Sequence, residues 1–266
     1  MWWISKILLK NFSPKELDAI SVRYIKRFIP KLIFPAFKIG IFFEYFLIKT
    51  SSFFEKPVVP ITTLFKKSDV IIDFTIPKCT LEVLKIALKQ KKRVIIGTTG
   101  FSQKEENFIK KISKKIPILK AGNMSLGINL LMYLTEIASK SLGINFQSKI
   151  FEAHHKFKKD YPSGTAIMLG QGISMGRNKN FKKIIGKKYL NKKNFPYGKR
   201  INFNSVRKGK IIGEHEVLFS SGKEIIRLNH EAFDRALYSE GALSAASWLM
   251  KKKPGLYSMR DILDFN

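Results

Sequence analysis

The chain has 266 residues, a length that suits one large domain or two small ones. Apolar residues make up 45% of it and aromatic residues 12%, enough to bury a core, so wholesale disorder is excluded. The single cysteine, Cys79, excludes a disulfide framework and any cysteine-built zinc site, and it is typical of a reducing, cytoplasmic compartment.

The charge is strongly positive, with 49 lysines and arginines against 20 aspartates and glutamates, a formal net charge of +29. Such a balance is one property of nucleic-acid-binding proteins. The lysines, however, are spread over nearly every predicted element, which favours a drifted composition over a selected polyanion site. We expect the positive field to attract an anionic substrate and a phosphorylated cofactor.

Residues 1–56 differ from the rest of the chain. Nine of the 22 phenylalanines lie in the first 54 residues, the hydrophobic pattern has no steady period, and Gly40 is the only glycine. No small-residue cleavage site follows the apolar opening, which argues against a secretory signal. Residues 32–48 contain Pro35 and Lys38, so they are too interrupted for the ~20 apolar residues of a membrane-spanning helix.

Strands and helices alternate regularly downstream of residue 57. We expect β-branched strands at residues 69–75, 93–97 and 116–121, and helices at 80–90 and 102–115. Ser102 and Glu105 have the spacing of a capping box at the start of the second helix. This alternation predicts a parallel, Rossmann-like sheet.

The second half has a different pattern. A helix at residues 125–142, a strand at 148–153 and a helix at 166–173 precede a patternless connection at 176–200. Strands are expected at 200–207, 210–219 and 223–229, and a closing helix at 240–251. Gly209 and the pair Ser221-Gly222 stand where hairpin turns would be, so the sequence predicts an α+β part with a mostly antiparallel open sheet.

Residues 152–165 carry the strongest chemical signal. His154 and His155 leave a predicted strand, Lys158 follows, and Gly164 and Thr165 open a helix. A helix start presents unpaired N–H groups to anions, and nearby histidine and lysine side chains can transfer protons. The arrangement predicts a cradle for carboxylates, whereas Ser163 alone is better explained as a helix cap. Two adjacent histidines without cysteines or paired carboxylates do not predict a zinc site.

These residues resemble a known family. The segments that carry the resemblance are Glu152-Ala-His-His155, Lys158, Pro162-Ser-Gly-Thr-Ala166, Gly97-Thr-Thr-Gly100, Ile72-Asp-Phe-Thr75, Gly213-Glu-His215 and Met259-Arg-Asp-Ile-Leu263. From about residue 58 to the C-terminus the chain is similar to the 4-hydroxy-tetrahydrodipicolinate (dihydrodipicolinate) reductases of lysine biosynthesis.

The resemblance implies a role for each matching position. His154 corresponds to the family's acid/base histidine and Lys158 to its proton donor. Substrate carboxylate contacts are implied for His155, Gly164 and Thr165. Cofactor contacts are implied for Gly97, Thr98, Thr99, Ala121, Gly122, Asn123 and Met124. Arg235 and His230 are candidates for a supporting role, and an exposed pair at a strand end explains them equally well.

The resemblance also implies an architecture and partners. Residues 1–125, atypical over 1–56 and completed by 236–266, would form the dinucleotide-binding domain, and residues 126–235 the substrate-binding and oligomerisation domain. The cofactor would be NADH or NADPH, the substrate a small dicarboxylate, and the assembly a homotetramer, with no metal, nucleic acid or membrane involved.

The glycine-rich turn G-x-x-G-x-x-G, whose amides hold the cofactor's pyrophosphate, is not found in residues 1–56. Three explanations remain: a lost turn, a replacement built from lysine and arginine, and a shifted reading frame or decayed gene start, which we rank first. We therefore expect weak NADH binding or none. Alternatives to an active reductase are a non-catalytic remnant, a nucleic-acid-binding protein and a form attached to membranes through its first 50 residues.

Overall fold

The computed structural model describes residues 39–43, 65–185 and 201–264. They fall into two compact units: unit 1 comprises residues 1–121 and 242–258, and unit 2 comprises residues 122–241 and 259–266. We describe each unit separately.

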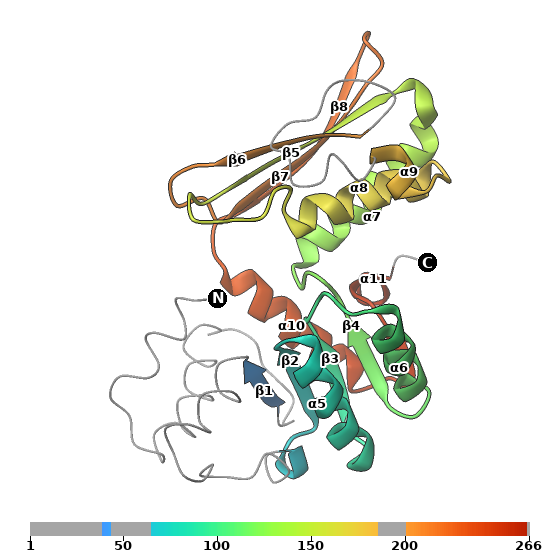
Figure 1. Ribbon diagram of the computed structural model, residues 1–266, viewed down its shortest axis with the longest axis vertical. Helices are drawn as coiled ribbons and strands as arrows, with labels where there is room; N and C mark the ends of the chain where they lie inside the picture. Colours follow the sequence, from blue (N-terminus) through green and yellow to red (C-terminus); the bar gives the residue numbers. More distant parts are fainter. Residues whose placement is uncertain (1–38, 44–64, 186–200, 265–266) are drawn as a thin grey trace. The chain divides into compact units, whose positions relative to one another are not determined.

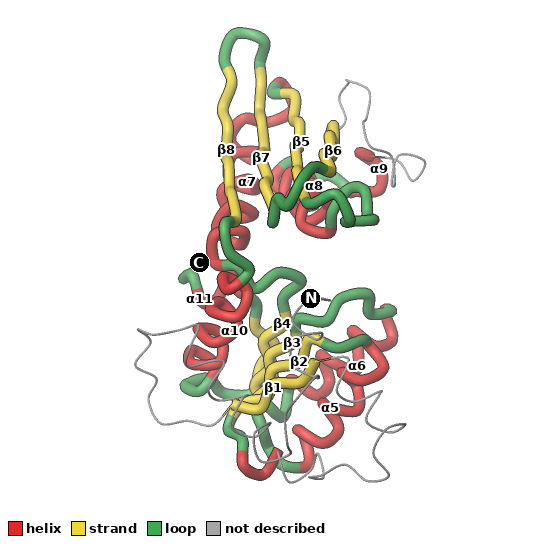
Figure 2. The backbone as a smooth tube through the Cα atoms, turned by 90° about the vertical axis from the view of Figure 1, so that its left-hand side faces the viewer, coloured by secondary structure: helices red, strands yellow, loops and turns green. Residues whose placement is uncertain are grey.

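Unit 1 is built on a parallel five-stranded sheet, sheet A (Figure 1). Its strands, in spatial order, are β1 (Ile39–Phe43), β2 (Val70–Phe74), β3 (Arg93–Ile96), β4 (Pro117–Lys120) and β9 (Gly255–Tyr257). Helices α5 (Pro77–Lys89) and α6 (Gln103–Ser113) lie on one face and α10 (Ala236–Leu249) on the other (Figure 2). This is the Rossmann-like layer arrangement expected from the alternating pattern.

The core of unit 1 explains why its strands are continuously apolar. Ile71, Val94 and Ile118 pack with the buried side chains of α5 and α6, while their strand neighbours Ile72 and Ile95 are equally buried on the opposite face. A parallel sheet covered on both faces needs apolar residues at successive positions.

Local signals fix where the helices of unit 1 begin. Pro77 occupies the first turn of α5, where its missing N–H has no consequence for the helix. At α6, the Ser102 side chain accepts a hydrogen bond from the Glu105 amide, and the Glu105 carboxylate accepts one from the Ser102 amide. The predicted capping box is therefore confirmed.

Unit 2 pairs a four-stranded sheet, sheet B, with helices on one face (Figures 1 and 2). The strands, in spatial order, are β6 (Asn202–Arg207), β5 (Gln147–His154), β7 (Gly213–Ser220) and β8 (Ile225–Ala232). The helices on that face are α7 (Leu126–Leu142), α8 (Gly164–Gly176) and α9 (Phe181–Ile185). The 3-10 turn η1 (Gly143–Asn145) follows α7, and α11 (Met259–Ile262) also belongs to unit 2 and contacts α7. Two of the three strand pairs are antiparallel, which confirms the expected mostly antiparallel sheet.

The alternation of sheet B separates a core face from an open face. Ile150, Phe203, Val217 and Phe219 pack against buried residues of α7 and α8, including Leu169. By the same alternation, Glu152, His154, Arg207 and His215 point toward the helix-covered face. The open face carries the exposed residues of β8, such as Ile225 and Arg227.

The hairpin predicted at Gly209 is wrong. β6 pairs with β5 in parallel and β5 separates it from β7, so residues 208–212 cross the end of β5 instead of closing a tight turn. The Lys208 amide donates to the His154 carbonyl, and the Lys156 amide donates to the Gly209 carbonyl, whose residue has φ +54°. The hairpin predicted at Ser221-Gly222 is confirmed, because β7 and β8 pair antiparallel from Ser220 and Ile225 onward.

Other boundaries differ by a few residues from the sequence expectations. α8 begins at Gly164 and ends at Gly176, and the strand expected from residue 210 begins at Gly213. β1 and β9 were not expected, and the short helix α9 lies inside the connection thought to lack structure. Expectations for residues 1–38, 44–64 and 186–200 lie outside the described residues. Among the described helices, none combines the length and apolar character required to cross a membrane.

Candidate active site

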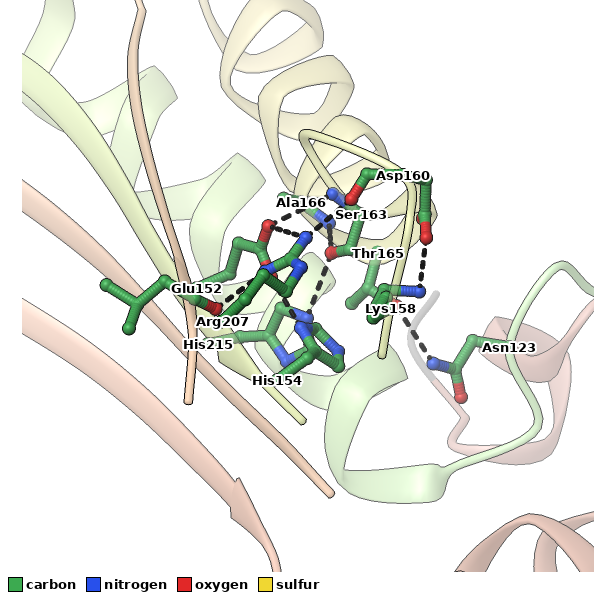
Figure 3. Close-up of polar contacts among 11 residues, drawn as sticks. Asn123, Glu152, His154, Lys158, Asp160, Ser163, Thr165, Ala166, Arg207 and His215 are labelled. Carbon is green, nitrogen blue, oxygen red and sulfur yellow. Dashed lines mark hydrogen bonds and ion pairs between the residues drawn. The ribbon is translucent and has the colours of Figure 1, made fainter. Parts of the chain in front are cut away.

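The end of β5, the loop 155–163 and the start of α8 form the candidate site (Figure 3). β5 ends at His154, so this imidazole is held by the sheet, whereas His155 already belongs to the loop. The Ser163 side chain accepts a hydrogen bond from the Ala166 amide at 3.2 Å and thereby caps α8, as the sequence predicts. Gly164 is exposed, and apart from its chain neighbours and its own helix no described atom lies within 4 Å of the position that a Cβ would take there.

Glu152 is the centre of a buried polar cluster. Its Oε2 lies 2.5 Å from His154 Nδ1, and its two oxygens accept hydrogen bonds from Arg207 Nη1 and Nη2 at 2.9 and 2.8 Å. The Ser163 amide donates to Oε1 at 3.2 Å. Register explains the cluster, because Glu152 and His154 share one face of β5 and Arg207 is the parallel partner of His154 on β6.

This cluster keeps Glu152 ionised. Burial alone would raise the pKa of the carboxyl, but hydrogen bonds from His154 and Arg207 outweigh it and lower the pKa from 4.5 to about 2. Glu152 is therefore a permanent hydrogen-bond acceptor at neutral pH.

A second buried imidazole, His215, lies edge-on to His154 with 5.0 Å between ring centroids. Its Nε2 is 3.3 Å from Ser163 Oγ. Burial is the largest cause that lowers the pKa of His215 to about 3, and the neighbouring imidazole of His154 adds to it when it is protonated, so the His215 ring is neutral across the physiological range.

Lys158 lies in the loop and Thr165 in the first turn of α8, and both lie on the same side of the site (Figure 3). Lys158 Nζ pairs with the Asp160 carboxylate at 2.9 Å. Thr165 Oγ1 accepts a hydrogen bond from Asn123 Nδ2 at 3.1 Å. The site thus gathers an ammonium group, an imidazole and a helix N-terminus, all groups suited to anion binding and proton transfer.

His155, the second residue of the pair, is half-buried. Burial and then the positive charge of Arg235 lower the pKa of His155. Arg235 itself is exposed, and His230 faces the start of α7, where a Cβ on Gly127 would meet its ring at 2.8 Å.

Four of the predicted cofactor residues lie in unit 1, at the carboxyl ends of two neighbouring parallel strands. Gly97, Thr98 and Thr99 follow β3, and Ala121 follows β4, where its amide donates to the Ile96 carbonyl. Thr98 is buried and its hydroxyl contacts that of Thr80 at 3.0 Å, whereas Thr99 is exposed. The other three predicted cofactor residues open unit 2, namely Gly122, Asn123 and Met124.

Glu152, His154 and His215 offer donor atoms within 4.8 Å of one another, the spacing of a metal site. The guanidinium of Arg207, however, already binds both oxygens of Glu152, and a divalent cation would have to displace that positive charge. This donor set fits an arginine–carboxylate–imidazole cluster better than a metal.

The sequence analysis missed the contributions of Arg207 and Asp160. Arg207 sits 55 residues after Glu152, and only the parallel pairing of β5 and β6 brings the two together. The i, i+2 spacing of Glu152 and His154 on a predicted strand was a usable signal, since such residues face the same side.

Comparisons with known proteins match both units. The family model described as dihydrodipicolinate reductase, N-terminus, matches residues 52–124, and the model described as dihydrodipicolinate reductase, C-terminus, matches residues 127–263. The 4-hydroxy-tetrahydrodipicolinate reductase of Pelagibacter ubique (strain HTCC1062) is 77% identical over 201 residues, covering 76% of this chain and 78% of that protein. The reductase of the same name from Hahella chejuensis (strain KCTC 2396) is 42% identical over 197 residues, 73% of each chain.

One solved structure shows the same fold. Dipicolinate-bound dihydrodipicolinate reductase from Paenisporosarcina sp. TG-14 superposes with a TM-score of 0.68 at 22% identity, covering 89% of this chain and 92% of that one.

Proposed function

Because the chain belongs to the dihydrodipicolinate reductase family, we propose that it reduces 4-hydroxy-tetrahydrodipicolinate to tetrahydrodipicolinate in the diaminopimelate route to lysine. The reaction consumes one reduced nicotinamide dinucleotide, NADH or NADPH, and one proton, and releases water. The observation that carries the proposal is the placement of His154, Lys158 and the amide end of α8 in one unit, on residues of the family's motifs.

The chain's own residues supply binding and proton transfer. The amide end of α8, with Gly164 and the Thr165 hydroxyl, suits a carboxylate, and His155 adds a donor. Lys158 gives a proton to the enamine carbon of the substrate, and His154 acts as the acid/base imidazole. The cationic surroundings balance the double negative charge of the substrate while further negative charge develops.

The nicotinamide end of a cofactor fits the carboxyl edge of sheet A. Dinucleotides bind outside the carboxyl ends of parallel strands, and Gly97, Thr98, Thr99 and Ala121 are at that edge. Space is open around the side-chain position of Gly100, whose φ is +88°. The resemblance also assigns Gly122, Asn123 and Met124 to the cofactor; these residues belong to unit 2. When a reduced nicotinamide is bound there, the hydride comes from it.

We also propose that the protein acts in the cytoplasm and assembles as a homotetramer through the open face of sheet B. Ile225 on that face is 49% exposed, and the exposed positions of β8 alternate regularly along the strand. Such a face is available for contact with other copies.

The direct test is a steady-state assay of the full chain with substrate generated in place by the preceding synthase. Oxidation of NADH or NADPH, at millimolar concentration, should depend on both the synthase and the chain. Binding of dipicolinate without any oxidation of cofactor would instead support the non-catalytic remnant, which the missing glycine-rich turn favours. If the chain neither binds dipicolinate nor turns over the substrate, the proposed function is wrong.

A further inference from the structure

We propose that Glu152 and Arg207 are positioning residues: Glu152 fixes the hydrogen of His154 on Nδ1, and Arg207 ties this imidazole to the loop that carries Lys158. The inference deepens the proposed function and rests on it for its catalytic consequence. Its structural part, the location of one hydrogen, is testable without turnover.

The tautomer of His154 follows from the Glu152 contacts. A carboxylate bound by both arms of a guanidinium is ionised and can only accept hydrogen bonds, so the 2.5 Å contact requires Nδ1 of His154 to be the donor. The free imidazole side chain favours the hydrogen on Nε2. Glu152 therefore selects the less common tautomer and leaves the lone pair of Nε2 for proton exchange.

The surroundings of Nε2 are kept open by a glycine. A Cβ on Gly213, the first residue of β7, would stand 3.3 Å from His154 Nε2 and 3.6 Å from His215 Cε1. Any side chain there would press on the nitrogen that the tautomer leaves available. His215, neutral and edge-on, holds the ring from the side without competing for a proton.

Arg207 connects this ring to the loop. Beyond its two bonds to Glu152, Nη2 donates to the Asp160 carbonyl at 2.6 Å, and the guanidinium lies 4.2 Å from the centre of the Tyr161 ring. The Asp160 carboxylate in turn pairs with Lys158. One buried guanidinium thus fixes both proposed proton-transfer groups, His154 through Glu152 and Lys158 through Asp160 (Figure 3).

The first experiment removes the charged pair as a whole. Glu152→Leu together with Arg207→Met leaves no buried unpaired charge, and such replacements commonly preserve stability. We expect kcat to fall about 100-fold with KM changed less than about threefold, because orientation and proton transfer are lost while the helix end remains. The matched control is Glu82→Leu with Lys85→Met, an exposed ion pair on α5 with 2.7 Å between Lys85 Nζ and Glu82 Oε1, which should keep its kcat.

The second experiment reads the hydrogen directly. Long-range 1H–15N correlation of the full chain should show neutral His154 with its hydrogen on Nδ1 in the unmodified protein, and on Nε2 in the Glu152→Leu/Arg207→Met variant. Arg207→Lys separates the two halves of the proposal. It keeps Glu152 ionised and the tautomer unchanged, but it loses the link to Asp160 and Tyr161, so kcat should fall about 10-fold.

Hydrogen on Nε2 in the unmodified protein would overturn the proposal, as would a folded double variant with kcat within about threefold of the unmodified chain. An unchanged kcat in Arg207→Lys would show that the contacts of Arg207 with the loop do not contribute to catalysis. If the unmodified chain does not turn over the substrate, the proposed function fails, and the NMR measurement still decides whether Glu152 selects the tautomer.

Discussion

The role of Lys158 as a proton donor can be tested against its neighbour Lys159. Lys159 has the same charge, but it is exposed and makes no ion pair among the described residues. If Lys158 is the proton donor, Lys158→Met should lower kcat about 100- to 1,000-fold, the usual contribution of a general acid. Steady-state assays at saturating substrate measure this. Lys159→Met should stay within about twofold, because one surface charge contributes only to the long-range field. Equal losses in both variants would indicate that overall charge matters, and not the placed ammonium group.

His215 makes the protein sensitive to mild acid. Its folded-state pKa is about 3 against an ordinary 6.5, so between these values the unfolded chain binds a proton that the folded chain does not. Stability is therefore fully present above pH 6.5 and falls by about 1.4 kcal/mol for each pH unit below it. Glu152 adds a separate loss as the pH drops from 4.5 toward 2, which leaves pH 6.5 to 4.5 for observing His215.

The variant His215→Gln tests this contribution of His215 to the loss of stability between pH 6.5 and 4.5. Urea unfolding at several pH values measures how the free energy of unfolding declines as the pH falls. In the variant this decline should be smaller than in the unmodified protein, by about 1.4 kcal/mol per pH unit. The slope should not vanish, because the pKa values of His155 and His230 are also lowered. A variant with the same slope as the unmodified protein would mean that His215 is protonated in the folded state.

At the scale of single residues, the sequence was informative where chemistry is local. Ser163 and Ser102 were predicted as caps because a cap depends on neighbours within four residues. Arg207 could not be assigned, since its role depends on β6 lying beside β5, a pairing that no short-range pattern encodes. The resemblance assigns Asn123 to the cofactor, and the structure adds a contact that the sequence did not predict, since its side-chain amide donates to Thr165.

Helices α7 and α8 pack closely because of glycines on α8. A Cβ at Gly176 would lie 2.3 Å from the Glu136 carbonyl oxygen, whereas one at Gly172 would meet the Met132 carbonyl at an ordinary 3.4 Å. Gly176→Ala should therefore push backbone against backbone and cost about 1–3 kcal/mol. Gly172→Ala should change stability by less than about 1 kcal/mol, in the stabilising direction, because alanine favours helix.

Urea unfolding of the two variants at neutral pH measures both effects, and each variant is the control for the other. Similar free energies of unfolding for the two variants would show that the C-terminal end of α8 can move relative to α7 without loss of stability. A loss in Gly172→Ala alone would contradict the packing described here.

At the scale of elements, the periodicity of the hydrophobic pattern and the length of each helix or strand decided what could be predicted. The strands β2, β3 and β4 of unit 1 are apolar runs between amphipathic helices, so their type and their parallel arrangement followed from the sequence. The order of strands in sheet B did not, because Gly209 is equally compatible with a hairpin and with the crossing segment that it occupies. β9, with three residues, is too short for any periodicity to mark it.

For the molecule as a whole, the decisive question is how strongly it holds a cofactor. The carboxyl edge of sheet A has the residues proposed for the nicotinamide end, but no G-x-x-G-x-x-G turn occurs in the sequence to hold the pyrophosphate. Two missing charge-assisted hydrogen bonds of about 1.5 kcal/mol each would weaken binding about 100-fold. Replacing residues 1–56 by a strand, such a turn and a helix should therefore raise the affinity for NADH or NADPH about 100-fold in calorimetric titration.

The matched control for this chimaera has alanine at the first two glycines of the turn, and it should bind as weakly as the unmodified chain. The net charge of +29 cannot substitute for the turn, because mobile lysines raise the local concentration of an anion without the fixed geometry of backbone amides. Micromolar binding of NADH by the unmodified chain would contradict this expectation. Such binding would show that the lysine- and phenylalanine-rich N-terminal segment forms a phosphate site of another kind.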